Sequence, residues 1–179
     1  MLERRSALAA AKPYVSTKLA IAERPGFTLT QVAGLDAGFE AKLSAVLGTL
    51  PQKVSAAEVH GERTIFRIGP AQFWILGPEK DETPAQLNGL CAVTPLSHSR
   101  VRIALSGAPV REVLAKLIPV DLHAPVFTPG SVALTGLHHT PVTVHCTGEH
   151  AFDIYAMRTF ALNVWDAVTD AARLFSDSR

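Results

Sequence analysis

The sequence predicts an α+β fold of two similar halves, each an antiparallel sheet covered by helices. Short segments rich in β-branched and aromatic residues come in pairs around turn residues, which is typical of antiparallel strands. Between these pairs, other segments carry apolar residues at every third or fourth position, the spacing of amphipathic helices. The chain has 179 residues, of which 47% are hydrophobic and 18% charged, so we expect a folded core and no extended disorder.

The first half is expected to span residues 18–96, after an N-terminal arm of residues 1–17. Its strands are predicted from their β-branched and aromatic residues at 18–22, 27–32, 63–68 and 72–76. Its helices are expected over 39–50, with Asp36 as cap and Pro51 as end, and from Thr83-Pro84 to 92–95, with Leu87, Leu90 and Cys91 on one face.

The second half is expected to span residues 97–179 and to form one compact unit with the first. Its strands are predicted at 101–105, 131–135, 142–146 and 152–156, and its helices at 110–117 and from about Thr159, with Phe160, Val164, Trp165, Val168, Ala172 and Phe175 along one stripe. The last two strands are expected to form a hairpin across Gly148-Glu149, with Val142, Val144 and Cys146 meeting Phe152, Ile154 and Ala156.

The N-terminal arm has no helical periodicity. It combines Leu2, Leu8, Tyr14 and Val15 with a central Pro13, which interrupts any helix that begins before it. Apolar side chains without a regular pattern gain order when they find a surface to cover. We therefore expect the arm to become ordered on a partner subunit.

Charge and composition exclude several classes of partner. Lysine and arginine number 17 and aspartate and glutamate 16, which leaves a net charge of +1 and predicts no binding to nucleic acid or to a membrane surface. The longest stretch without these residues, 122–148, is broken by prolines and histidines and is not expected to cross a membrane. The chain starts with charges and no signal-peptide core, so it is expected to be cytoplasmic.

The histidines raise the hypothesis of a metal site. His138 and His139 are adjacent, and neighbours in a strand point to opposite faces, so they cannot hold one ion together. His145 shares a face with His138 only across a hairpin, and no carboxylate is close in sequence. We therefore interpret them as surface or edge-strand histidines.

Two further motifs resemble catalytic groups. Ser97-His98-Ser99 combines a nucleophile with a base, but neighbours on a strand diverge and no strand–turn–helix elbow surrounds them. Cys91 and Cys146 lie on apolar faces and are expected to be small buried hydrophobic residues instead of reactive thiolates.

Anion-binding motifs are weak as well. The glycines stand singly beside turn residues, so no phosphate-binding loop is predicted. Arg100 and Arg102 flank a buried strand and either hold an anion or are solvated or paired with a carboxylate. No catalytic, cofactor-binding or metal-binding residue is predicted, which favours a subunit or binding role over an autonomous enzyme.

Several stretches resemble the gamma subunit of heterotetrameric sarcosine oxidase. The resemblance is carried by Leu96–Lys116, Pro119–Leu122, Phe127–Gly130 and Phe152–Trp165, with Arg5–Leu8 and Ile68–Pro78 upstream. That family is similar to part of the aminomethyltransferase fold, the T-protein of glycine cleavage. The resemblance thus implies a T-protein-like α+β fold.

The resemblance also implies a complex with alpha, beta and delta subunits that oxidises an N-methyl amine and uses folate. The partner subunits would carry FAD, FMN, NAD, zinc and tetrahydrofolate, and this chain no cofactor. The chain would pack against the aminomethyltransferase-like half of alpha as a non-catalytic subunit of an oxidoreductase.

One departure from the aminomethyltransferase pattern supports a structural role. Those enzymes carry an acidic pair on a hairpin turn, where this sequence has His138-His-Thr-Pro-Val142. Asp121 matches the family's loop aspartate, but its setting between Val120 and Leu122, after Pro119, is typical of a turn. The alternatives are an autonomous folate-binding protein or aminomethyltransferase, and a scaffold unrelated to amine oxidation.

Overall fold

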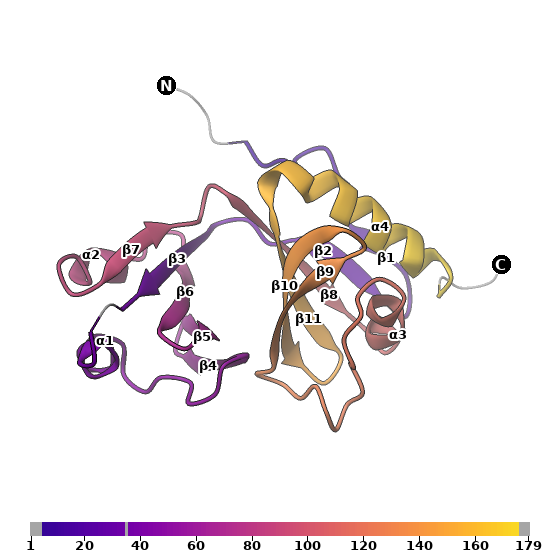
Figure 1. Ribbon diagram of the computed structural model, residues 1–179. Helices are drawn as coiled ribbons and strands as arrows, with labels where there is room; N and C mark the ends of the chain where they lie inside the picture. Colours follow the sequence, from indigo (N-terminus) through magenta and orange to yellow (C-terminus); the bar gives the residue numbers. More distant parts are fainter. Residues whose placement is uncertain (1–4, 35, 176–179) are drawn as a thin grey trace. The chain divides into compact units, whose positions relative to one another are not determined.

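The computed structural model describes residues 5–34 and 36–175, which form two compact units (Figure 1). One unit, here called the six-stranded unit, contains the described residues up to Pro25 and from Ser99 onward. The other, the five-stranded unit, contains Gly26–His98. The expectation that the two halves form one compact unit stays a prediction.

The six-stranded unit has the strand order β1-β2-β8-β11-β10-β9, and every pairing is antiparallel. Its elements are β1 (Tyr14–Val15), β2 (Ala20–Glu23), β8 (Arg100–Ser106), α3 (Val110–Ala115), β9 (Val132–Leu137), β10 (Thr140–Gly148), β11 (Ala151–Met157), the 3₁₀ turn η1 (Arg158–Phe160) and α4 (Ala161–Arg173). The predicted strands and helices of the second half are thus present.

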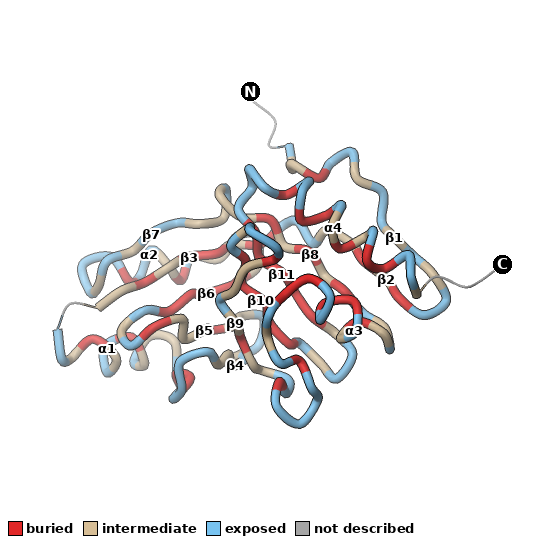
Figure 2. Tube along the Cα trace, turned by 45° about the vertical axis from the view of Figure 1, so that its right-hand side comes forward, coloured by how far each residue is buried: buried red, intermediate tan, exposed pale blue. Residues whose placement is uncertain are grey.

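One face of this sheet forms the core with α3 and α4. The apolar positions of β10 and β11 meet in the expected register, with Val144 opposite Ile154 and Cys146 opposite Phe152. Val113 of α3 and Val168 of α4 pack with them and are fully buried. Figure 2 shows buried positions along β8, β10 and β11. Phe160, expected on the buried stripe of α4, instead precedes the helix and is 39% exposed.

The strand β2 belongs to the six-stranded unit, although the sequence placed it in the first half. Ala20 lies opposite Ser106 and Ile21 opposite Leu105, so β2 pairs with β8, which follows only after the whole five-stranded unit in the sequence. The boundary expected at 96/97 lies at 98/99, and a second boundary follows Pro25. A short strand satisfies its backbone equally well at any free sheet edge, and here the core around Ile21 selects the edge of β8.

The expected N-terminal arm packs, over its described residues, on the chain's own core. Leu8 is 2% exposed within the core of the six-stranded unit, and β1 pairs with β2. The hydroxyl of Tyr14 donates to the carbonyl of Ala172 at 3.2 Å. The interpretation of residues 5–17 as an arm that orders on a partner was wrong, because Leu8 and Tyr14 already pack on the chain's own core, although Val15 is 75% exposed. Residues 1–4 lie outside the described residues.

The five-stranded unit has the order β4-β5-β6-β3-β7, again with antiparallel pairs. Its elements are β3 (Phe27–Ala33), α1 (Phe39–Leu47), β4 (Ala56–His60), β5 (Arg63–Gly69), β6 (Gln72–Pro78), α2 (Thr83–Gln86) and β7 (Ala92–Pro95). The hairpin of β5 and β6 is as expected, and Phe39 and Leu43 of α1 pack on one face of the sheet with Phe73.

The five-stranded unit differs from the sequence prediction at three places. The helix α1 begins after Gly38, while Asp36 accepts a hydrogen bond from the Gly38 amide at 2.8 Å in a preceding turn. The helix α2 is a single turn, because its chain leaves the helix at Leu87 and reaches Gly89 with φ of +83°. Residues 92–95 then form a strand beside β3, where a helix end was expected.

The strand β4 was not predicted. Its five residues are Ala56-Ala-Glu-Val-His, which have no regular alternation of apolar and polar positions. It forms at the edge of the sheet because its backbone pairs with β5.

The two units repeat one topology. Each runs strand, helix, three strands, helix, and the sheets have corresponding orders, β4-β5-β6-β3 and β9-β10-β11-β8. The sheets differ at the fifth position. In the five-stranded unit β7 pairs with the free side of β3, and in the six-stranded unit β2 pairs with the corresponding side of β8. The prediction of two similar halves is confirmed at the level of topology.

Candidate functional site

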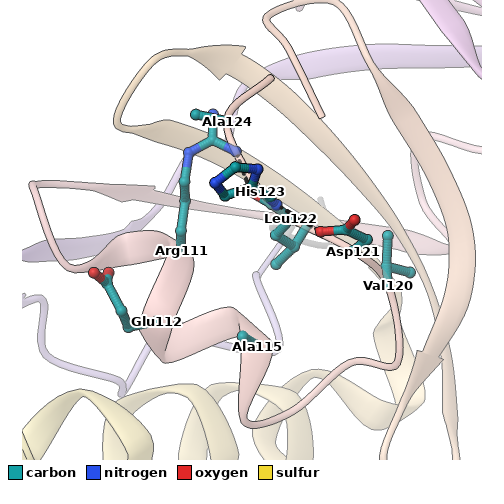
Figure 3. Close-up of a pocket in the computed structure, with 8 residues that line it drawn as sticks. All are labelled: Arg111, Glu112, Ala115, Val120, Asp121, Leu122, His123 and Ala124. Carbon is teal, nitrogen blue, oxygen red and sulfur yellow. Dashed lines mark hydrogen bonds between the residues drawn. The ribbon is translucent and has the colours of Figure 1, made fainter. Parts of the chain in front are cut away.

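A cavity of about 430 Å³ opens at α3 and the loop that follows it (Figure 3). Its lining comes from one helical face and one loop, and consists of Arg111, Glu112, Ala115, Val120, Asp121, Leu122, His123 and Ala124. The small and apolar side chains form an apolar lining, and four charged or titratable side chains surround it.

The guanidinium of Arg111 is committed to the backbone around the cavity. Its Nη1 donates to the carbonyl of Leu122 at 2.5 Å and to that of Phe127 at 3.0 Å. Its Nε donates to the carbonyl of Glu149 at 3.1 Å, and the central guanidinium carbon, Cζ, lies 5.0 Å from the ring centroid of Phe152. Arg111 therefore connects α3 to the loop and to the β10–β11 turn, which fixes the shape of the cavity.

The carboxylates of the cavity are exposed. Asp121 accepts a hydrogen bond from the amide of His123 at 2.9 Å, so it forms the turn expected from the sequence. In Figure 3, Glu112 and Asp121 lie on opposite sides of the cavity, with His123 between them. The arrangement can receive a side chain or a small molecule, but it does not bring the two carboxyl groups together for acid–base work.

A second group of polar side chains crosses β8, β10 and β11 on the face away from α3 and α4. Both Nε and Nη2 of Arg102 donate to Oδ2 of Asp153, at 2.9 and 2.7 Å. Asp153 is opposite His145 in the register of β10 and β11, and Tyr155 is opposite Arg102. Of the two interpretations left open for Arg102, the structure selects pairing with a carboxylate.

Burial controls ionisation in this group. It lowers the pKa of His145 to about 4, an effect that Asp153 opposes and Arg102 reinforces. Burial, with the nearby charge of Asp153, also raises the pKa of the Tyr155 phenol. Both side chains are therefore neutral at pH 7, and the only charges in the group are the paired ones of Arg102 and Asp153.

The cysteine thiols are protonated at neutral pH. Cys146 is buried, and burial raises the pKa of its thiol, although Arg111 opposes the shift. Its thiol donates to the carbonyl of Gly148 at 3.2 Å. Cys91 is only partly buried, and burial raises the pKa of its thiol too. Neither thiol has the lowered pKa of a reactive cysteine.

The Ser-His-Ser motif has a backbone role. The Ser97 hydroxyl accepts from the amide of Leu29 at 2.9 Å and donates to its carbonyl at 3.3 Å. The Ser99 hydroxyl accepts from Nη1 of Arg100 at 3.1 Å, and His98 is exposed. Burial lowers the pKa of the Arg100 guanidinium.

The histidines that raised the hypothesis of a metal site differ in their exposure to solvent. His138 and His139 form the exposed turn between β9 and β10, where His138 has φ of +50°, so they are surface histidines as expected. His145 is instead buried on β10, which lies between β11 and β9, so the surface or edge-strand interpretation was wrong for this residue. Within residues 5–34 and 36–175, no three His, Cys, Asp or Glu side chains are grouped to hold a metal ion.

Sequence reasoning missed Arg111, Asp153 and Tyr155. Asp153 and Tyr155 alternate with the apolar residues of β11, which marks them as members of its second face. Their burial and partners depend on strands distant in sequence.

Among the helices of the described part of the chain, none is long and apolar enough to cross a membrane.

Comparison with solved structures first defines the class of fold. The chain matches glycine cleavage system aminomethyltransferase T from Bartonella henselae with a TM-score of 0.60, over 86% of this chain and 46% of that one. The sequence identity is 16%, so the likeness concerns the fold. The two units thus have the aminomethyltransferase-like fold expected from the sequence.

The family follows from a more specific match. A model of the sarcosine oxidase, gamma subunit family matches residues 36–173, most of the chain. The chain therefore belongs to the sarcosine oxidase gamma subunit family. A chain of the heterotetrameric sarcosine oxidase from Corynebacterium sp. U-96, in complex with pyrrole 2-carboxylate, matches with a TM-score of 0.88 and 25% identity, over 98% of both chains. Comparison with curated protein sequences gives no significant match.

Proposed function

We propose that this chain is the gamma-type, non-catalytic subunit of a sarcosine oxidase-like complex that oxidises an N-methyl amine and uses folate. The observation that carries the proposal is the match to a chain of a heterotetrameric sarcosine oxidase over 98% of both chains. A likeness that extends along the whole of both chains favours an equivalent place in an equivalent assembly.

The partners proposed are alpha, beta and delta subunits, in a cytoplasmic complex. FAD, FMN, NAD, zinc and tetrahydrofolate are assigned to those partners, and this chain is proposed to pack against the aminomethyltransferase-like half of alpha. That position is what the resemblance to the sarcosine oxidase gamma subunit implies.

The arrangement of ionisable groups supports a structural role. The Arg111 guanidinium donates hydrogen bonds to backbone carbonyls, and Arg102 donates to Asp153 within an ion pair. His145 and Tyr155 are held neutral by burial. The hydrogen bonds of Arg111 and of the Arg102–Asp153 pair stabilise the fold, which favours a structural role for these groups.

Co-expression of the partner subunits with and without this chain tests the proposal. A subunit that binds only the folded partner stabilises it by about 2.7 kcal/mol at a hundredfold excess over Kd. Omission should therefore lower the yield and Tm of the assembly, while turnover per bound flavin stays unchanged.

Two results would contradict the proposal. If turnover per flavin collapses while the assembly stays intact, this chain contributes to the chemistry. If the isolated chain binds tetrahydrofolate tightly in calorimetry, the autonomous folate-binding alternative takes its place.

A further inference from the structure

Three large apolar side chains are exposed within six consecutive residues where β11 ends and α4 begins. Met157 and Phe160 are each 39% exposed, and Leu162 is 53% exposed. The 3₁₀ turn and first helical turn between them span only about 10 Å. We call Met157, Phe160 and Leu162 the β11–α4 patch.

The patch is held rigidly. The amide of Arg158 donates to the carbonyl of Ser99 at 2.8 Å, and the amide of Ala161 closes the 3₁₀ turn on the carbonyl of Arg158. Ala161 and Val164 are buried in the core and anchor the start of α4. The apolar side chains are therefore presented to solvent by well-packed backbone, so little conformational entropy would be lost when a partner covers them.

Arginines lie beside the patch. Met157 is the register partner of Arg100, and the side chain of Arg158 donates to the backbone carbonyl of Arg5. Within residues 5–34 and 36–175, neither Arg5 nor Arg158 forms an ion pair with a carboxylate. The carboxylate of Glu23 accepts a hydrogen bond from the hydroxyl of Ser6, the residue that follows Arg5 in the sequence. The patch is thus apolar with a cationic margin.

We propose that the β11–α4 patch docks on a partner subunit, against a surface with an apolar centre and acidic side chains at its edge. This inference rests on the proposed function as a subunit. Methionine, aromatic residues and arginine are the residues enriched where protein subunits meet, and lysine is depleted there. Charge complementarity selects the acidic edge, because Arg5 and Arg158 have no carboxylate of their own described chain to neutralise them.

An anionic membrane would also attract apolar and cationic groups. A helix that lies on a membrane needs a broad apolar face, and the apolar stripe of α4 is buried in the unit's own core. Only the first turn of α4 and the residues before it contribute to the patch. The observations therefore favour a protein surface.

Leu162→Asp tests the proposal, with Leu134→Asp as the matched control. Leu134 is 52% exposed on β9, nearly the same as Leu162, and lies outside the patch. The carboxylate of Leu162→Asp falls in the first turn of α4, where the helix dipole favours it, so the Tm of the isolated chain should not fall. The partner subunits, expressed without this chain, are titrated with the wild-type chain and each variant, and Kd is measured.

We expect Leu162→Asp to weaken binding by about tenfold or more and Leu134→Asp to leave Kd within twofold. Arg158→Glu should also weaken binding, and the wild-type Kd should rise between 50 and 500 mM NaCl, conditions chosen to span weak and strong screening, roughly a Debye length of 14 to 4 Å.

Each other outcome overturns the inference. If the wild-type chain does not bind the partner subunits, the proposed function fails and the docking proposal with it. If it binds and Leu162→Asp binds equally well, or if both variants weaken binding alike, only the docking proposal fails. If phosphatidylserine vesicles retain the wild-type chain and not Leu162→Asp, while subunit binding is unchanged, the patch serves a membrane instead.

Discussion

Arg102 and Asp153 form an ion pair across adjacent strands, with Asp153 buried to 1% exposure and Arg102 to 19%. The pair is diagonal in the ladder, because Asp153 is opposite Ala104 and Arg102 is opposite Tyr155. Two hydrogen bonds, at 2.9 and 2.7 Å, join the guanidinium to one carboxylate oxygen. The pair therefore connects β8 to β11 across 51 residues of sequence.

Asp153→Ala should destabilise the chain by about 3 kcal/mol, because it leaves the Arg102 charge buried without its partner. Urea unfolding followed by circular dichroism measures the change. The control is Asp170→Ala, which removes an exposed pair with Arg173 and should cost no more than about 0.5 kcal/mol. Equal effects of the two variants would contradict the role given to the buried pair.

The free energy of unfolding should fall as the pH drops below about 6.5, because His145 binds a proton in the unfolded state but stays neutral in the folded state. Burial lowers the folded pKa of His145 to about 4, below the ordinary value of 6.5. Between these values the unfolded state binds more protons, so stability rises with pH, and the loss at pH 5.5 relative to pH 7.5 is on the order of 1 kcal/mol.

His145→Gln should remove this pH dependence, measured as the urea midpoint at the two pH values. His139→Gln is the control, since His139 is exposed in the β9–β10 turn. A wild-type pH dependence that persists in His145→Gln would assign it to another group.

Gly107→Ala should destabilise the chain by roughly 2–4 kcal/mol. Gly107 has φ of +136°, and a Cβ there would lie 2.0 Å from the carbonyl oxygen of Lys18. Gly61→Ala provides the comparison, because Gly61 also has positive φ, at +59°, but has open space around it. It should cost roughly 1 kcal/mol, and thermal unfolding separates the two.

Arg111→Lys should loosen the loop of residues 119–130, because one ammonium cannot replace a guanidinium that bonds the carbonyls of Leu122, Phe127 and Glu149. Limited digestion with chymotrypsin, which cleaves after aromatic residues such as Phe127, should be several-fold faster than in the wild type. Arg173→Lys, at a side chain 72% exposed, should leave the rate unchanged. An unchanged rate in Arg111→Lys would show that the loop is held without the guanidinium.

Local pattern was sufficient for the hairpins and the long helices. The alternation of Val142, Val144 and Cys146 matches that of the facing strand, and only one register brings both apolar sets to one face. The stripe of α4 was equally clear, except at Phe160, where the 3₁₀ turn rotates the side chain off the helical face. The family resemblance came from the order and identity of residues, which periodicity does not encode.

The sequence by itself determined where most strands and helices form, that the sheets are antiparallel and that two similar halves exist, because these depend on apolar spacing within a few residues. The tertiary structure alone decided that β2 joins β8, that residues 92–95 form a strand beside β3, and that Arg102 meets Asp153, 51 residues away. Such contacts depend on which distant edge or charge the folded core brings within reach. Short strands and single charged side chains carry no local signal that names their partner.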